Sequence, residues 1–82
     1  MSTAQTLRRF GPALRSCRQA AGLSQHQLAR RLGTTQGHVS RIECGHARPS
    51  LRMALALAQF FAQQGDPALL TTLTEVRHAR AV

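Results

Sequence analysis

The pattern of apolar and polar positions is clearest over the middle of the chain, where two short amphipathic segments follow one another. In the first segment, Leu28, Ala29 and Leu32 recur at the spacing of one helix face, with polar residues between them. In the second, Val39 and Ile42 recur in the same way. No segment alternates apolar and polar residues as a half-buried β-strand would. The pattern therefore predicts an all-α fold.

Polar residues and glycines set the limits of these two helices. Ser24 and Gln27 are spaced as a capping box, in which each side chain bonds the backbone N–H of the other at the start of a helix. Gly33 ends that helix, because glycine takes the left-handed conformation without a steric penalty. Thr35 is a candidate N-cap for the second helix, which Gly45 closes. Two short helices joined by a sharp turn in this way form a helix-turn-helix motif.

One further helix is expected before this motif. It carries Phe10, Leu14 and Cys17 on one face. Its start is ambiguous, because Pro12 fits the first turn of a helix but would kink one that began earlier. Residues 1–5 are expected to be disordered.

Two more helices are expected after the motif. Ser50 is the N-cap of a helix that reaches about Gln63, and an acid followed by Pro67 marks the start of another that runs to about Arg80. With 82 residues the chain forms one small domain, a five-helix bundle. Residues 66–82 are assigned to dimerisation.

The helix after Ser50 is apolar on more than one face. One stripe is assigned to the core of the bundle and consists of Leu51, Ala54, Leu55 and Ala58. The other stripe and the apolar residues of the last helix together present more apolar surface than one small bundle buries. A second subunit is therefore expected to cover this surface. This expected dimer interface consists of Met53, Leu57, Phe60, Phe61, Leu70, Leu73 and Val76. The alternative is that the last helix covers all of these residues within one chain.

The chain carries a net charge of +8, and all 11 of its Lys and Arg residues are arginine. Such a charge favours a polyanionic partner, and the planar guanidinium suits phosphates and guanine edges. No apolar run approaches the roughly 18–20 residues that a membrane span needs, so no membrane partner is expected. Three scattered acids supply no carboxylate cluster for a metal-dependent reaction. The protein is therefore expected to be neither an enzyme nor the carrier of a cofactor.

Cys17 and Cys44 are expected to be reduced thiols, because no secretory signal accompanies them. This favours a cytoplasmic protein. Cys17 lies on an apolar helix face, and Cys44 lies at the exposed end of the second motif helix. Cys44 and His46 look like part of a chelate, but a structural zinc site needs four ligands and no second pair is near in the sequence. No metal is expected.

The motif belongs to a longer set of ordered residues. These are Gly-Leu-Ser-Gln at 22–25, Leu-Ala at 28–29, Leu-Gly at 32–33, Ser-Arg-Ile-Glu at 40–43, Gly45 and Pro-Ser at 49–50. Together they resemble the Cro/C1-type, XRE-like helix-turn-helix DNA-binding family, over about residues 14–61. The resemblance implies a phage-repressor-like bundle of bacterial, phage or plasmid origin. It also implies a homodimeric repressor that binds a palindromic operator in double-stranded DNA through the major groove.

With its apolar residues inward, the second motif helix has a polar outer face. Gln36 suits a bidentate contact to adenine, and Arg41, just over one turn later, suits one to guanine. Gly37 leaves a gap that a thymine methyl group would fill. The residues expected to read bases are Gln36, Gly37, His38 and Arg41.

Residues at the edges of the motif are expected to hold phosphate. Gln25 opens the first motif helix, whose N-terminus attracts anions, and the resembled family uses a glutamine here for that contact. The resemblance also implies an ion pair between Glu43 and Arg18, which leaves Arg18 able to touch phosphate as well. The expected phosphate contacts are Gln25, Thr35, Ser40, Arg48 and Arg18, with His46 and Arg52 as further candidates.

Two other functions fit the same features. An antitoxin would use the apolar surplus of the last two helices to bind a partner toxin, while it also binds its own operator. A restriction–modification controller protein would activate as well as repress. The sequence leaves both open beside the dimeric repressor.

Overall fold

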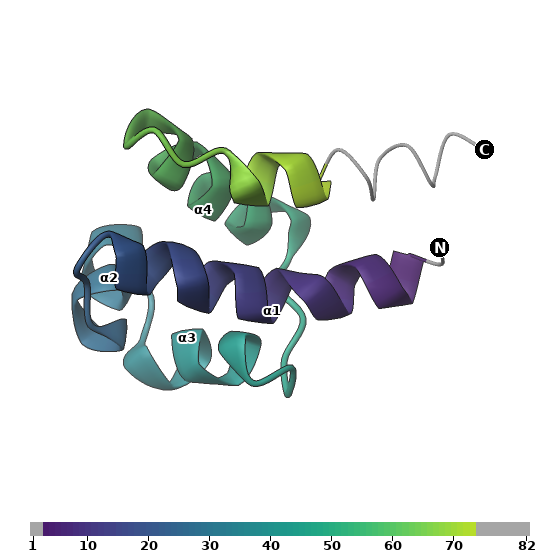
Figure 1. The fold of residues 1–82 in the computed structure, drawn as a ribbon. Coiled ribbons are helices and arrows are strands. Elements are labelled where there is room, and N and C mark those ends of the chain that lie inside the picture. Colours follow the sequence, from purple (N-terminus) through teal and green to yellow (C-terminus); the bar gives the residue numbers. More distant parts are fainter. Residues whose placement is uncertain (1–2, 74–82) are drawn as a thin grey trace.

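The helix α1 (Thr3–Ala20) is the longest of the structure and lies through the middle of the molecule (Figure 1). The computed structural model describes the backbone of residues 3–73 and the side chains of residues 9–73. After α1 come α2 (Gln25–Leu32), α3 (Gln36–Glu43), α4 (Leu51–Gln63) and a helical stretch over residues 68–73. In Figure 1, α3 lies on one side of α1, and α4 with the last stretch lies on the other. The described part of the chain contains no strand, so the expected all-α fold is confirmed.

The short helices begin and end at the residues that the sequence predicts. The Ser24 hydroxyl accepts a hydrogen bond from Gln27 N at 3.0 Å, and Gln27 Oε1 accepts one from Ser24 N at 2.8 Å, which completes the capping box. Gly33 follows α2 with a φ of 70°. The hydroxyls of Thr35 and Ser50 accept hydrogen bonds from His38 N and Met53 N, both at 3.1 Å, and so cap the starts of α3 and α4. These bonds satisfy backbone N–H groups that a helix start leaves unpaired.

The start of α1 differs from the expectation. The helix begins at Thr3, so residues 3–5, which the sequence assigns to a disordered segment, belong to it. Pro12 lies inside the helix, where it removes one backbone hydrogen bond. Its side chain is exposed, so the ring meets solvent and not the core.

Gly11 allows α1 to cross α3 at very short range. A Cβ at this position would lie 2.5 Å from Ile42 O and 2.8 Å from Glu43 O, far inside van der Waals contact. The main chain at the end of α3 therefore rests directly on the backbone of α1. No prediction for this residue followed from the sequence, because a glycine in a helix is recognised as a crossing point only when the neighbouring helix is known.

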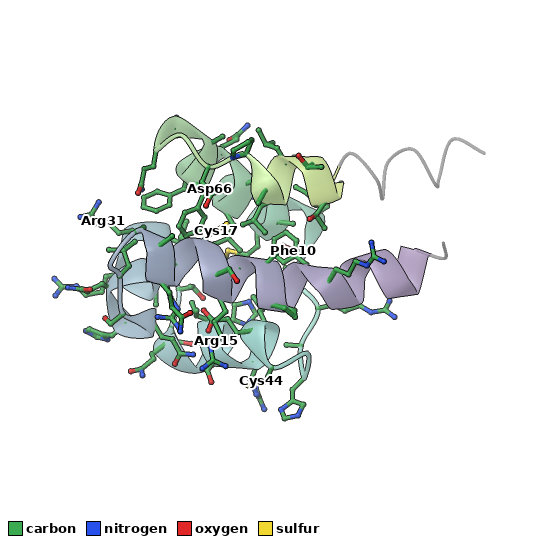
Figure 2. All side chains as sticks on the ribbon, in the orientation of Figure 1. Phe10, Arg15, Cys17, Arg31, Cys44 and Asp66 are labelled. Carbon is green, nitrogen blue, oxygen red and sulfur yellow. The ribbon has the colours of Figure 1, made fainter. Side chains whose placement is uncertain are left out.

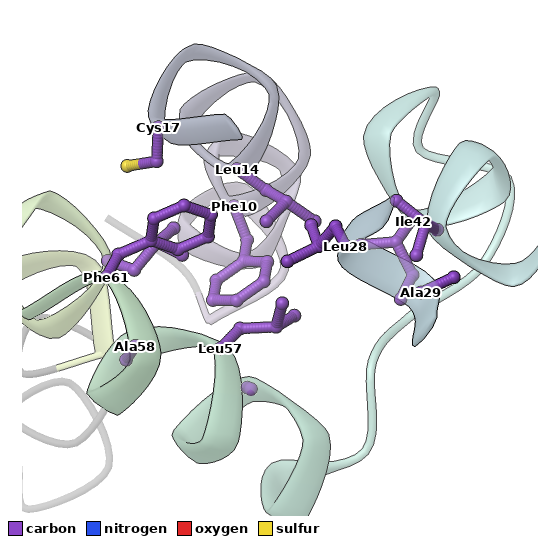
Figure 3. Packing of buried hydrophobic residues seen from close by; sticks show 12 residues of the cluster. Phe10, Leu14, Cys17, Leu28, Ala29, Ile42, Leu57, Ala58 and Phe61 are labelled. Carbon is purple, nitrogen blue, oxygen red and sulfur yellow. The ribbon is translucent and has the colours of Figure 1, made fainter. Parts of the chain in front are cut away.

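The core joins α1, α2, α3 and α4 in one cluster (Figure 3). Phe10 and Leu14 of α1 pack with Leu28 of α2, and with Leu57 and Phe61 of α4; all are fully or almost fully buried. Leu69, from the stretch after α4, is also fully buried and extends the cluster. The last helix therefore takes part in the core of a single chain.

The assignment of the two stripes of α4 is wrong in part. Ala54 and Ala58 are buried as expected, but Leu57 and Phe61 are each only 1% exposed and belong to the core. The remaining members of the expected core stripe, Leu51 and Leu55, are 62% and 42% exposed. Both stripes fit helical spacing, and the rotation of α4 about its axis decides which one faces inward.

The other residues of the expected dimer interface differ among themselves. Met53, Phe60 and Leu73 are half-buried and pack against the core cluster. Leu70 is exposed, and Val76 lies outside the described residues. Within the described part, the exposed large apolar side chains are Leu51, Leu55 and Leu70. We call these three residues the exposed leucines.

Candidate nucleic-acid interface

The second motif helix, α3, has two faces of opposite character. Val39 and Ile42 are buried in the core cluster. Gln36 and Arg41 are exposed on the outer side of the same helix. The two buried side chains hold the helix in place, so that its polar face is presented as a rigid surface.

The other residues of α3 that are expected to contact DNA differ in how exposed they are. Gly37 is exposed, and a Cβ added there would have no atom of the protein within 4 Å. His38 and Ser40 are half-buried at the sides of the helix. The open position of Gly37 leaves a notch in the polar face between Gln36 and Arg41.

The turn between α2 and α3 fixes the angle of the motif. The backbone N–H of Thr34 donates to Ala29 O at 2.9 Å, which closes the end of α2. Leu28 and Ala29 are buried against the other helices. Thr35, at the start of α3, is exposed, and its hydroxyl already accepts a hydrogen bond from His38 N at 3.1 Å.

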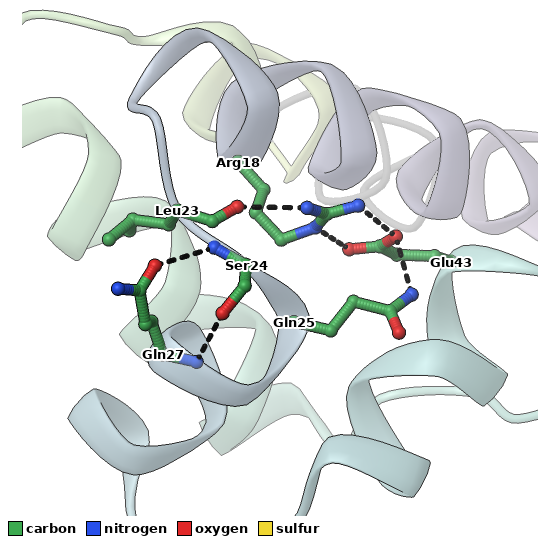
Figure 4. A network of polar contacts seen from close by, with 6 residues as sticks. All are labelled: Arg18, Leu23, Ser24, Gln25, Gln27 and Glu43. Carbon is green, nitrogen blue, oxygen red and sulfur yellow. Dashed lines mark hydrogen bonds and ion pairs between the residues drawn. The ribbon is translucent and has the colours of Figure 1, made fainter.

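A polar network connects α1, α2 and α3 beneath this face (Figure 4). Arg18 Nε donates to Glu43 Oε2 at 2.7 Å, and Arg18 Nη2 donates to Glu43 Oε1 at 3.1 Å. The expected ion pair is therefore present in a bidentate form, which is the strongest geometry for such a pair. Gln25 Nε2 donates to the same Glu43 Oε1 at 3.1 Å. This last bond was not expected, because the sequence does not tell which side chains meet across the motif.

Arg18 is occupied within the protein. Its Nη1 donates to Leu23 O at 2.9 Å, so all three guanidinium nitrogens have a partner, and the side chain is only 11% exposed. The hydrogen bond to Glu43 raises the pKa of Arg18 above its already high usual value. This environment fits a structural cation better than the phosphate contact that the sequence also assigned to Arg18.

Arg15 is a basic residue that the sequence analysis did not select. It follows Gly11 by four residues and precedes Arg18 by three, so the three residues share the face of α1 that meets α3. Arg15 is exposed, and Figure 2 shows it beside α3. The close approach of α3 to Gly11 identifies this face of α1 as the one toward α3, and with it Arg15 as a candidate.

The loop from α3 to α4 adds exposed basic groups. His46, Arg48 and Arg52 are all exposed, at the end of the motif or at the start of α4. The backbone N–H of His46 donates to Arg41 O at 2.8 Å, so the loop turns back on the end of α3. The side chain of His46 therefore begins close to the end of α3 that carries Arg41.

The two cysteines are free and lie in different surroundings. Cys44 is exposed after α3. Cys17 is buried, and Asp66 lies near it (Figure 2). Burial and a hydrogen bond to Asp66 raise the pKa of Cys17 to about 11. The Cys17 thiol is therefore protonated and unreactive near neutral pH.

Neither a metal centre nor a membrane span is found in the described residues. No group of three or more His, Cys, Asp or Glu side chains there could hold a metal ion. The described helices also fall short of the length and apolar character that crossing a bilayer requires.

Comparison with known proteins identifies the family. A helix-turn-helix family model matches residues 14–63, which is more than half of the chain. The chain belongs to the XRE-like, Cro/C1-type helix-turn-helix family. No curated protein and no solved structure matched the chain in the corresponding searches.

The matched segment of this XRE-like domain runs from the second half of α1 to the end of α4 and includes the whole motif. The protein is a DNA-binding transcriptional regulator of the XRE kind. This family is one of DNA-binding regulatory domains and not of enzymes.

Proposed function

We propose that the protein is a homodimeric repressor that binds a palindromic operator with one α3 in each of two successive major-groove segments. The observation that supports this most directly is the outer face of α3, where Gln36 and Arg41 are exposed on a helix held from behind by Val39 and Ile42. A rigid helix with polar side chains on one face fits the major groove. A bound dimer excludes other proteins from the same DNA, which is how a small domain represses.

Gln36 and Arg41 are the proposed base-reading pair. The planar amide of glutamine matches N6 and N7 of adenine, and the guanidinium of arginine matches O6 and N7 of guanine. Gly37, between them, admits a base or its methyl group to the helix backbone. His38 lies at the side of the helix and is proposed as a weaker contact.

Replacing Arg41 with alanine should reduce specificity at one guanine of each half-site. We expect a loss of about 1–3 kcal/mol of discrimination there, with a smaller loss on other sequences. The measurement is the affinity for a selected operator and for its single-base variants. Equal weakening on every variant would instead make Arg41 a phosphate contact.

The proposed phosphate contacts surround the base-reading pair. They are Gln25, Thr35, Ser40, Arg48 and Arg15, with His46 and Arg52 beside them. Thr35 remains suitable although it caps α3, because its hydroxyl accepts from His38 N and still has its own O–H to donate. Arg15 takes the place of Arg18 in this set, since Arg18 is engaged by Glu43 and Leu23.

Binding should depend steeply on salt concentration, because each neutralised phosphate releases counterions. With about two to three arginine contacts to phosphate per subunit, from Arg15, Arg48 and Arg52, log K should fall against log[salt] with a slope of roughly −4 to −5 for the dimer. Fluorescence anisotropy over a salt series measures the slope. A slope near −2 would show that the net charge of +8 serves another purpose.

The exposed leucines are the proposed centre of the dimer interface. Leu51, Leu55 and Leu70 expose apolar surface that a second subunit would cover. Met53, Phe60 and Leu73, which are half-buried, extend this surface. A two-fold interface uses the same patch on both subunits, and it would set the distance between the two copies of α3.

A further inference from the structure

The side chain of Gln25 is held in place before any ligand arrives. Gln25 is the first residue of α2, and its Nε2 donates to Glu43 Oε1 at 3.1 Å. Glu43 is the last residue of α3, so the bond crosses the motif (Figure 4). A glutamine side chain loses rotamer freedom when it is fixed, and here that loss occurs on folding and not on binding.

The acceptor of this bond is itself rigid. The Glu43 side chain is only 2% exposed, and both of its oxygens accept hydrogen bonds from Arg18. Arg18 is fixed in turn by its bond to Leu23 O, immediately before the cap of α2. The position of the Gln25 amide is therefore determined by α1, α3 and the loop before α2 together.

The charges of this network also suit a neighbouring phosphate. An unpaired carboxylate next to Gln25 would repel a phosphate, but Arg18 balances the charge of Glu43 at 2.7 Å. An amide nitrogen has two N–H groups. The bond to Glu43 uses one of them and orients the other.

We infer that Glu43 is a positioning residue for DNA binding: it aligns the Gln25 amide so that its second N–H meets a DNA phosphate, and Arg18 makes this possible by neutralising Glu43. This inference rests on the proposed function, in which Gln25 contacts the DNA backbone. It gives Arg18 an indirect part in binding in place of a direct phosphate contact.

The test compares the effect of Gln25→Ala in three backgrounds of the full chain. The first is the wild type. The second is the double variant Arg18→Met with Glu43→Met, which removes both charges and keeps similar volume, a replacement that buried ion pairs often tolerate. The third is Glu43→Gln, which keeps an oxygen acceptor for Gln25. Circular dichroism and thermal unfolding identify the variants that are folded, and the affinity for duplex DNA of non-specific sequence is then measured by anisotropy.

The expected result is that the effect of Gln25→Ala depends on the background. It should weaken binding roughly tenfold in the wild type, the factor that a hydrogen bond to a charged group contributes. In the doubly substituted background it should weaken binding by less than about threefold, because the amide is no longer aligned. Glu43→Gln should preserve most of the wild-type effect. Within each background, Gln25→Ala should leave the slope against log[salt] unchanged, since a neutral amide releases no counterion.

Three other outcomes overturn the inference and differ in what they say of the proposed function. An equal loss from Gln25→Ala in all three backgrounds means that Gln25 binds phosphate without help from Glu43. No loss in the wild type, while Arg41→Ala still changes base preference, removes Gln25 from the interface but leaves α3 as the reading helix. If neither substitution affects binding, the proposed function itself fails. Should the doubly substituted background not fold, NMR signals of the Gln25 side-chain amide in the wild type answer the same question. One N–H protected from exchange in the free protein and the other protected only with DNA support the inference, and no protection in the free protein overturns it.

Discussion

Phe61→Ala should lower the free energy of unfolding by about 3–5 kcal/mol, the usual cost of removing a buried phenylalanine ring. Phe61 is only 1% exposed and packs in the cluster that joins α1, α2, α3 and α4. A domain of this size has a total stability of roughly 5–15 kcal/mol. The variant should therefore lose a large part of its stability, although the sequence pattern assigned this residue to a dimer interface.

Leu55→Ala is the matched control on the same helix. Leu55 is 42% exposed, so its removal should change the stability of the monomer by no more than about 0.5 kcal/mol. It should instead weaken dimerisation. Urea unfolding at low protein concentration, where association does not contribute, and sedimentation at high concentration measure the two effects. A Phe61→Ala protein of normal stability that no longer dimerises would restore the interface expected from the sequence.

Replacing either of two helical glycines with alanine should change the stability of the protein, but in opposite directions. Gly11→Ala should destabilise the protein by about 1–3 kcal/mol, as overpacking usually does. Its Cβ would lie 2.5 Å from Ile42 O, and a backbone oxygen cannot move aside as a flexible side chain can. The clash outweighs the higher helix propensity of alanine.

Gly37→Ala should stabilise the protein by about 1 kcal/mol, the difference in helix propensity between the two residues. No protein atom lies within 4 Å of the added methyl group. The same methyl fills the notch in the polar face of α3, so operator affinity should fall or base preference at that position should change. Thermal unfolding and operator binding of both variants test this pair. A neutral Gly11→Ala would mean that α1 and α3 are not in close contact.

The limits of α2 and α3 could be predicted from the sequence because they depend on neighbours in the chain. The Ser24 and Gln27 capping box and the Thr35 cap each act within three residues. A left-handed turn at Gly33 is equally local. The short range of these interactions explains why the helix-turn-helix motif, and with it the polar outer face of α3, follows from the sequence alone.

Only the tertiary structure determines which contacts the side chains of α4 and Arg18 make. The spacing of apolar residues in α4 allowed two stripes, and the packing of the chain selected the one with Leu57 and Phe61 for the core. Arg18 was recognised as the partner of Glu43 from the resemblance to the family, but its bond to Leu23 O removes it from the proposed phosphate contacts.

Two features could not be predicted, because they arise where segments far apart in the chain come together. Gly11 is a crossing point only because the end of α3 lies on it, and that contact gives Arg15 its place beside α3. The bond from Gln25 to Glu43 joins residues 18 positions apart. Local sequence determined the elements of this protein, and the packing of one helix on another determined which side chains form its core, its network and its surface.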